Sequence, residues 1–130
     1  MIERAKKSIS IEYFIYNTDR AGRVFTQALI KKVQEGVRVR ILLDHFLPVR
    51  EITPYHAHEL KKLGVEIRYY NPGPTAPTAK IQYRHHRKLF MIDEEAVIIG
   101  GRNIGDDYFD LSHHYNFLDR DLYIKGPIVE

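Results

Sequence analysis

Residues 8–44 constrain the fold of this 130-residue chain more than any other segment. Apolar residues alternate loosely through residues 8–16 and regularly through residues 37–44, which predicts two strands. Between these strands, Asp19 can cap a helix whose apolar residues form one stripe, and Gly36 can end that helix. Two strands joined by a helix through short links pair in parallel by a right-handed crossover. The segment therefore predicts an α/β fold.

The rest of the chain first continues this alternation and then changes to consecutive strands. We predict a helix over residues 53–63 and further strands over residues 65–70, 89–92, 96–99 and 121–125. The prolines within residues 71–79 predict an irregular loop, either the rim or lid of a site or an exposed connector. We expect a single domain, residues 1–130, with a mixed, mostly parallel sheet flanked by helices on both faces.

The strongest chemical signal lies in residues 86–103. His86 and Lys88 are two residues apart, so an extended backbone projects both side chains to the same face. After an acidic turn, a second apolar strand leads to the pair Gly100-Gly101, which brings Asn103 near the same end of the sheet. An imidazole, an ammonium group and a carboxamide that converge without evident metal ligands predict phosphoryl chemistry.

The spacing His86-x-Lys88-x4-Asp93-x6-Gly100-Gly101-x-Asn103 resembles the HKD signature of the phospholipase D superfamily. Residues 102–109 (RNIGDDYF) are similar to bacterial cardiolipin synthases in particular. The resemblance also includes residues 8–44 and residues 117–127 (FLDRDLYIKGP), so it covers nearly the whole chain. Members usually carry two HKD motifs, in one chain or in two paired chains. This chain holds one motif, so we expect it to be the N-terminal half of a longer enzyme.

The resemblance implies a role for each polar residue of the motif. His86 would attack phosphorus and form a phosphohistidine intermediate, while Lys88, Asn103 and Gly101 would bind the phosphate oxygens. The leaving alkoxide needs a proton from the opposite side of phosphorus, because attack and departure are in line. The family supplies that acid from the second motif. No metal or other cofactor is implied.

Carboxylates complete the predicted site. The family places an Asp or Glu on the strand after the Asn, where it holds the ring of the nucleophile in one tautomer. Asp119 best matches this position, and Asp121 is the alternative. Asp93 belongs to the signature, but we interpret it chiefly as a structural carboxylate that holds the turn and the neighbouring loops. His85 is expected to point away from His86 and to pack or lie at the surface.

Two further groups of polar residues have simpler interpretations. The pair Asp106-Asp107 predicts a helix start or cap rather than a catalytic pair. A zinc site formed by Asp110, His113 and His114 is a weaker hypothesis, because neighbouring side chains on a strand or loop diverge.

Composition limits the partners. The chain has no cysteine and a formal net charge of +3. Its cations gather before the motif, where they would concentrate phosphate-bearing substrates, although a solvated basic loop is an equal alternative. A nucleic-acid groove would need a longer basic track, so none is expected. No apolar run is long enough to span a bilayer. We therefore expect an enzyme that binds phospholipid substrate peripherally at the membrane surface, on the cytoplasmic side of a bacterial membrane.

Three functions remain open at this point. The first is a cardiolipin synthase-like phosphatidyltransferase or phosphodiesterase that acts on anionic glycerophospholipids. The second is a single-motif nuclease or phosphodiesterase that completes its site by homodimerisation, although the usual residue after the first glycine would then be serine rather than Gly101. The third is a non-catalytic interaction domain, which the presence of both His86 and Lys88 does not favour.

Overall fold

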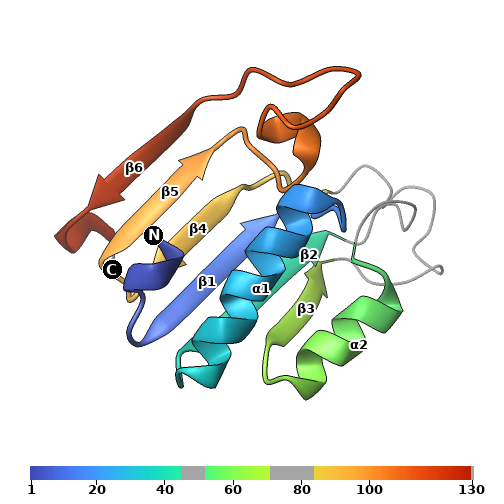
Figure 1. Cartoon of the computed structure of the whole chain (residues 1–130). Helices are drawn as coiled ribbons and strands as arrows, with labels where there is room; N and C mark the ends of the chain where they lie inside the picture. Colours follow the sequence, from blue (N-terminus) through green and yellow to red (C-terminus); the bar gives the residue numbers. More distant parts are fainter. Residues whose placement is uncertain (45–51, 71–83, 130) are drawn as a thin grey trace.

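The computed structural model describes residues 1–44, 52–70 and 84–129. A six-stranded sheet in the order β3-β2-β1-β4-β5-β6 forms its centre (Figure 1). The strands are β1 (Ser8–Tyr13), β2 (Arg38–Asp44), β3 (Glu66–Tyr70), β4 (Leu89–Ile92), β5 (Ala96–Gly100) and β6 (Asp121–Lys125). The α-helices are α1 (Arg20–Gln34) and α2 (Pro54–Lys62), and the short 3-10 turns are η1 (Ile2–Arg4), η3 (Asp106–Tyr108) and η4 (Pro127–Val129).

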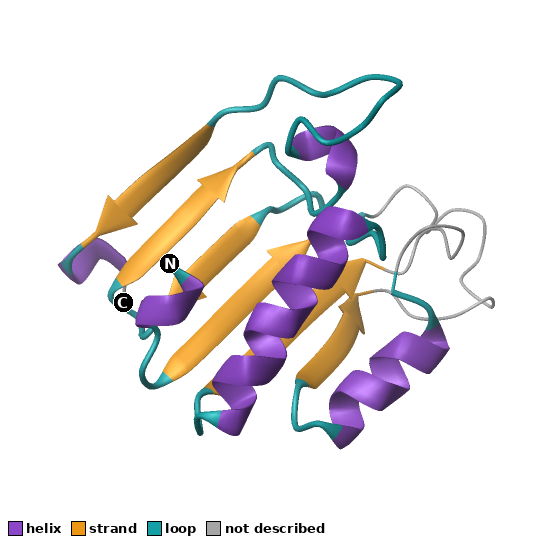
Figure 2. Ribbon diagram, viewed as in Figure 1, coloured by secondary structure: helices purple, strands orange, loops and turns teal. Residues whose placement is uncertain are grey.

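Local capping signals start both α-helices where the sequence predicts them. Asp19 Oδ1 accepts a hydrogen bond from the Gly22 N–H at 3.1 Å, and Thr53 Oγ1 accepts one from the His56 N–H at 3.3 Å. The helices connect β1 to β2 and β2 to β3, and these strands pair in parallel. Both helices lie on the same face of the sheet (Figure 2), because two right-handed crossovers that step in one direction place their helices on one side.

The predicted mixed α/β sheet is confirmed, with two differences in detail. β4 runs antiparallel to β1, and β4, β5 and β6 pair antiparallel, so the sheet is not mostly parallel. The tight turn between β4 and β5, where Asp93 and Glu94 have φ angles of 54° and 59°, accounts for the antiparallel β4–β5 pair, since a hairpin joins only antiparallel strands. The expectation of helices on both faces is wrong for the described residues, because α1 and α2 cover the same face.

The covered face of the sheet holds the core. Ile9 and Ile11 on β1, Val39 and Ile41 on β2, and Leu29 on α1 are at most 2% exposed. These side chains alternate with polar ones along each strand, which is the period of two that the sequence predicted. Burial of these aliphatic side chains supplies the main stabilisation of the sheet. The packed strands therefore fix the positions of the residues at their ends.

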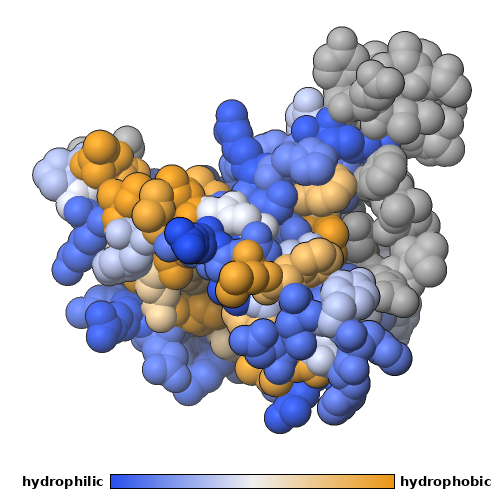
Figure 3. Space-filling model, turned by 90° about the horizontal axis from the view of Figure 1, so that it is seen from above, coloured by the Kyte–Doolittle hydropathy of each residue, from blue (hydrophilic) through white to orange (hydrophobic). Residues whose placement is uncertain are grey.

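One edge of the sheet collects the predicted site residues. β1, β2, β3 and β5 end there, and the antiparallel strands β4 and β6 begin there (Figure 1). His86 precedes β4, Asn103 follows β5, and Asp119 precedes β6, so all three lie at this edge. Figure 3 looks down on the edge and shows hydrophilic residues over much of it, with a group of hydrophobic residues at the side that carries the C-terminal segment. The predicted lid, residues 71–79, lies outside the described residues.

Candidate active site

The His86 ring stacks on the aromatic ring of Phe14, which we call the aromatic platform. His86 is exposed and stands just before β4, on backbone that belongs to no regular strand. Its ring stacks on Phe14, with a distance of 4.1 Å between ring centroids and an angle of 19° between ring planes. Phe14 follows the last residue of β1. The stacking leaves the edge of the imidazole, where its nitrogens lie, available for chemistry.

Lys88 lies next to the same platform. Its Nζ is 5.5 Å from the centroid of the Phe14 ring and donates a hydrogen bond to the His86 carbonyl at 2.7 Å. Burial lowers the pKa of the Lys88 ammonium, and the negative charge of Asp119 partly opposes this shift. The prediction that His86 and Lys88 project together is therefore confirmed by their shared contact with Phe14, although β4 begins only at Leu89.

Asn103 contacts the residue that follows Phe14. Its side chain is buried, and its Oδ1 accepts a hydrogen bond from the Ile15 N–H at 3.1 Å. It also forms a hydrogen bond with the Tyr108 side chain. Burial raises the pKa of the Tyr108 phenol, and this hydrogen bond partly opposes that rise. The amide thus contacts the backbone immediately after Phe14. The three polar residues of the motif gather around residues 14–15, and Asn103 is engaged in fixing that segment.

The glycine pair makes room for two carboxylates. A Cβ on Gly101 would overlap Asp119 Oδ1, and a Cβ on Gly100 would overlap Asp121 Oδ1. The predicted phosphate contact of Gly101 stays a prediction, and in the free domain its N–H donates to the Arg120 carbonyl at 3.3 Å. Gly101 instead lets the Asp119 carboxylate approach the sheet near Lys88.

The two candidate carboxylates have different surroundings. Asp121 forms an ion pair with Arg102, at 2.8 Å between Oδ2 and Nε. Arg102 also donates to the carbonyl oxygens of Tyr108 and Asp119, so it ties the chain on both sides of the site. Asp119 is half-buried, and its charge acts on Lys88. The structure gives Asp119 no hydrogen bond to His86 within the described residues, so its predicted role in holding that ring stays a prediction.

Asp93 lies away from the other motif residues, at the opposite end of β4. Its Oδ1 accepts hydrogen bonds from the N–H groups of Lys7 at 2.7 Å and Ser8 at 2.8 Å, and its Oδ2 accepts one from Lys6 at 2.9 Å. Burial raises the pKa of the Asp93 carboxyl, but these three hydrogen bonds outweigh burial and the net pKa is lowered. Asp93 therefore fastens the β4–β5 turn to the start of β1 and is not part of the reacting group.

Sequence reasoning missed a cluster that holds the backbone before His86. His85 was expected to pack or lie at the surface, yet its Nε2 is 2.9 Å from Glu12 Oε2, and its N–H donates to Asp44 Oδ2 at 2.7 Å. Asp44 also pairs with Arg84 at 3.3 Å. One signal for Asp44 was present in the sequence: it is a carboxylate at the carboxyl end of a parallel strand, where α/β proteins place functional residues.

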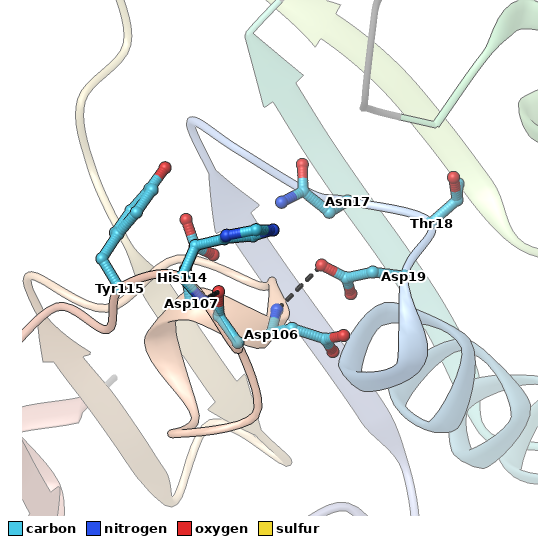
Figure 4. A pocket seen from close by; sticks show the side chains of 8 residues that line it. Asn17, Thr18, Asp19, Asp106, Asp107, His114 and Tyr115 are labelled. Carbon is cyan, nitrogen blue, oxygen red and sulfur yellow. Dashed lines mark hydrogen bonds between the residues drawn. The ribbon is translucent and has the colours of Figure 1, made fainter.

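Two cavities open near this edge. One of about 340 Å³ is lined by Lys88 together with apolar side chains that include Tyr13, Phe25, Phe90 and Phe109. The second, of about 650 Å³, is polar and is shown in Figure 4. Its lining residues are Asn17, Thr18, Asp19, Asp106, Asp107, Ser112, His114 and Tyr115.

The polar cavity is built around the start of α1. Asp19 Oδ2 accepts from the Asp106 N–H at 2.8 Å, and Asp106 Oδ1 accepts from the Ala21 N–H at 2.7 Å (Figure 4). Asp106 thus acts as a cap, as predicted, but for α1 and from a distant part of the chain. In the part of the chain that the structure describes, no group of three or more histidine or carboxylate side chains is arranged to hold a metal ion.

The His86 ring and the partly buried Lys88 ammonium group lie against Phe14, and the buried Asn103 amide binds the N–H of the next residue, Ile15. Residues 1–125 match the family model described as cardiolipin synthase, PLD-like domain. The chain belongs to this family. Among the described residues, no helix has the length and apolar character needed to span a membrane.

Individual relatives show how much of a longer protein the chain represents. It is 38% identical over 130 residues to a cardiolipin synthase of Oceanobacillus iheyensis and 36% identical over 125 residues to the major cardiolipin synthase of Bacillus subtilis. It covers 27% and 26% of these two proteins, which in turn match 99% and 95% of the chain. The chain thus spans about a quarter of the length of the curated relatives it matches.

A solved structure shares the fold. The phospholipase D family member Nuc from Salmonella typhimurium superposes with a TM-score of 0.63 at 17% identity. The match covers 94% of this chain and 68% of that one. The six-stranded phospholipase D-like sheet is therefore the architecture of this domain.

Proposed function

We propose that this domain supplies one half of a phospholipase D-type active site that cleaves or transfers a phosphodiester of an anionic glycerophospholipid. The observation that carries the proposal is the stacking of His86 on Phe14 with Lys88 beside the same ring. A nucleophile and a cation are thereby placed next to each other on a rigid support. The match to the cardiolipin synthase domain over residues 1–125 favours a phospholipid over other phosphodiesters.

The first step is attack of a His86 ring nitrogen on phosphorus. A neutral imidazole is a competent nucleophile near pH 7, because its reference pKa is about 6.5. An N–P bond forms, the P–O bond to the leaving alkoxide breaks, and the alkoxide takes a proton from a general acid on the opposite side of phosphorus. In the second step the general acid, now deprotonated, takes the proton from an acceptor alcohol or water as its oxygen attacks phosphorus. A P–O bond forms, the N–P bond breaks, and the free imidazole is restored.

Lys88 and Asn103 would stabilise the phosphate oxygens during both steps. Lys88 carries a preorganised charge in a half-buried place, where charge is more effective than in water. Asn103 accepts from the Ile15 N–H through Oδ1 and also bonds Tyr108, so an N–H of its amide would be the group that donates to a phosphate oxygen. Asp119 would keep Lys88 protonated and would support the positive charge that develops on His86.

The apolar cavity beside Lys88 favours a lipid substrate. A glycerophospholipid presents an anionic phosphate attached to an apolar body, and this cavity combines the cations Lys88 and Arg102, with Asp121 beside them, and aromatic walls. Exposed Tyr115, Phe117 and Leu118, which is 97% exposed, precede Asp119 and could rest on the membrane surface. These apolar residues support a peripheral position of the domain at a bacterial membrane.

The site needs a second half to be complete. The proposed general acid comes from a second HKD motif, either elsewhere in a longer chain or in a paired copy of this one. The domain alone should then have little turnover. A homodimeric nuclease remains the alternative function, and its substrate would be nucleic acid.

The test uses the full-length protein that contains this domain. Incubation with phosphatidylglycerol vesicles should yield cardiolipin or phosphatidic acid, and an alkaline quench during turnover should trap phosphorus on His86. The control is His58→Ala, an exposed histidine on α2, which should leave the rate unchanged. Cleavage of single-stranded DNA with no change in the lipid would overturn the proposal in favour of the nuclease. A chelator should not slow the lipid reaction, because Lys88 and Asn103 stabilise the phosphate charge.

A further inference from the structure

The backbone just before His86 is held by residues from β1 and β2. The His85 N–H donates to Asp44 Oδ2 at 2.7 Å, and Asp44 stands at the end of β2. The His85 ring meets Glu12 on β1, with 2.9 Å between Nε2 and Oε2. Arg84 donates to Asp44 Oδ1 at 3.3 Å. His85 is therefore held through both its backbone and its side chain.

Burial makes the Asp44 contact strong. The Asp44 side chain is completely buried, and the Arg84 side chain is only 13% exposed. A buried carboxylate is costly unless its charge is paired and its hydrogen bonds are made. The segment at Arg84 and His85 supplies those bonds, so a movement of this segment would leave the Asp44 charge without them. The resting position of His85 is thus strongly preferred.

The two consecutive histidines contact two residues that lie two positions apart, one on β1 and one just after it. His85 meets Glu12, and His86 stacks on Phe14. The pair of contacts sets the register of the motif segment against the end of β1. Residues 84–88 belong to no regular strand, and His86 itself is exposed, so strand hydrogen bonds alone do not determine where its ring lies.

We infer that Glu12, Asp44 and His85 form a clamp of positioning residues that keeps the His86 ring on Phe14 in its reactive place. None of the three touches the phosphate; they act through the backbone that carries the nucleophile. A displacement of about 1 Å in a reacting group can cost about a hundredfold in rate, so a clamp of this kind is a direct requirement for attack. The kinetic part of the inference rests on the proposed function, whereas the structural part does not.

The structural part is tested by NMR on the full-length protein with histidine labelled at Cε1. The His86 signal, assigned by its loss in His86→Gln, should be shifted upfield by the ring current of Phe14, and Phe14→Leu should abolish this shift. Glu12→Ala should move the signal toward its position in Phe14→Leu, and Glu12→Gln, which keeps a hydrogen-bond acceptor, should restore most of it. The matched control is Glu66→Ala, which removes an exposed ion pair with Arg38 and should leave the signal in place.

The kinetic part is tested on the same proteins with phospholipid vesicles. Glu12→Ala should lower kcat about tenfold with little change in KM, because the nucleophile is displaced while the lipid contacts remain. Glu12→Gln should recover most of the rate, and Glu66→Ala should match the unaltered enzyme. If Glu12→Ala does not fold, His85→Ala and His85→Gln replace the pair with the same expectations.

The possible outcomes separate the two proposals. A His86 signal and a kcat that both stay unchanged in folded Glu12→Ala would overturn the clamp. A fall in kcat without movement of the signal would also overturn it, because Glu12 would then act in another way. A signal that moves in a protein without phosphodiester activity would support the clamp and reject the proposed function.

Discussion

The two ends of β4 carry parts of the same motif and are built in opposite ways. At the start, His86 stands on irregular backbone, is exposed and stacks on Phe14, while Asp44 of β2 binds the N–H of the preceding residue, His85. At the end, Asp93 sits in a tight turn, and its carboxylate is bound by three backbone N–H groups. The first end presents His86, the proposed nucleophile. The second end fastens the turn between β4 and β5 to the start of β1. A sequence motif can therefore combine chemistry and architecture in residues that never meet.

The contrast between the two ends of β4 is tested most strongly by removing the His86 side chain. His86→Ala should lower the phosphodiester activity of the full-length protein at least about a thousandfold, because it removes the proposed nucleophile. The free energy of unfolding should change by less than about 0.5 kcal/mol, because the side chain is exposed. Vesicle assays and urea unfolding measure the two quantities. Robust turnover by this variant would place the nucleophile elsewhere.

The next largest effect is expected at Gly101. Gly101→Ala places a methyl group where Asp119 Oδ1 lies, so the carboxylate must leave its place near Lys88. We expect a loss of activity of about tenfold to a hundredfold. Gly36→Ala is the control, because Gly36 has a φ of +85° and open space around it, and it should cost about 1 kcal/mol of stability without changing kcat. Equal kcat values for the two variants would show that Asp119 has no part in the reaction.

A smaller effect, on stability rather than chemistry, is expected at the far end of β4. Asp93→Asn tolerates the positive φ but weakens three charge-assisted hydrogen bonds, so it should lower the free energy of unfolding by about 1.5 kcal/mol. The kcat of the folded protein should not change. Glu95→Gln, on an exposed residue of the same turn, should stay within about 0.5 kcal/mol of the original protein. A large loss of kcat in folded Asp93→Asn would contradict the structural role.

The pH dependence of this effect follows from the lowered pKa of Asp93. The folded state favours the ionised carboxylate, so the added stability is fully present above the unfolded-state pKa of about 3.9. It is lost as the pH falls through the lower folded-state pKa. The difference in unfolding free energy between the original protein and Asp93→Asn should therefore shrink as urea titrations are moved from neutral pH into that acidic range. A constant difference would reject the assigned hydrogen bonds.

Sequence patterns predicted the strands and helices well because their signals are local. The alternation around Ile9 and Ile41 and the capping residues Asp19 and Thr53 act within a few positions of the chain. The same patterns did not determine the pairing of β4 with β1. That pairing depends on which strand edge remains open after β1, β2 and β3 have paired, and this is a property of the whole sheet.

The site was predicted in part for the same reason. His86 and Lys88 lie two residues apart, so their shared side could be derived from backbone geometry alone. Phe14 and Asp44 lie far from them in the chain, and only folding brings both against residues 84–88. The sequence predicts Gly101 as a phosphate ligand, but only the structure shows that a Cβ at Gly101 would overlap Asp119 Oδ1.

The sequence by itself determined the family and the order of the strands and helices, because each depends on residue type and short spacing. Tertiary structure alone decided that Asp93 is separated from His86 by the length of β4, that Phe14 stacks on His86, and that Glu12 and Asp44 hold the preceding His85. The physical reason is that a sheet converts distant positions in sequence into neighbours through strand pairing. Contacts formed in this way have no local signal in the chain.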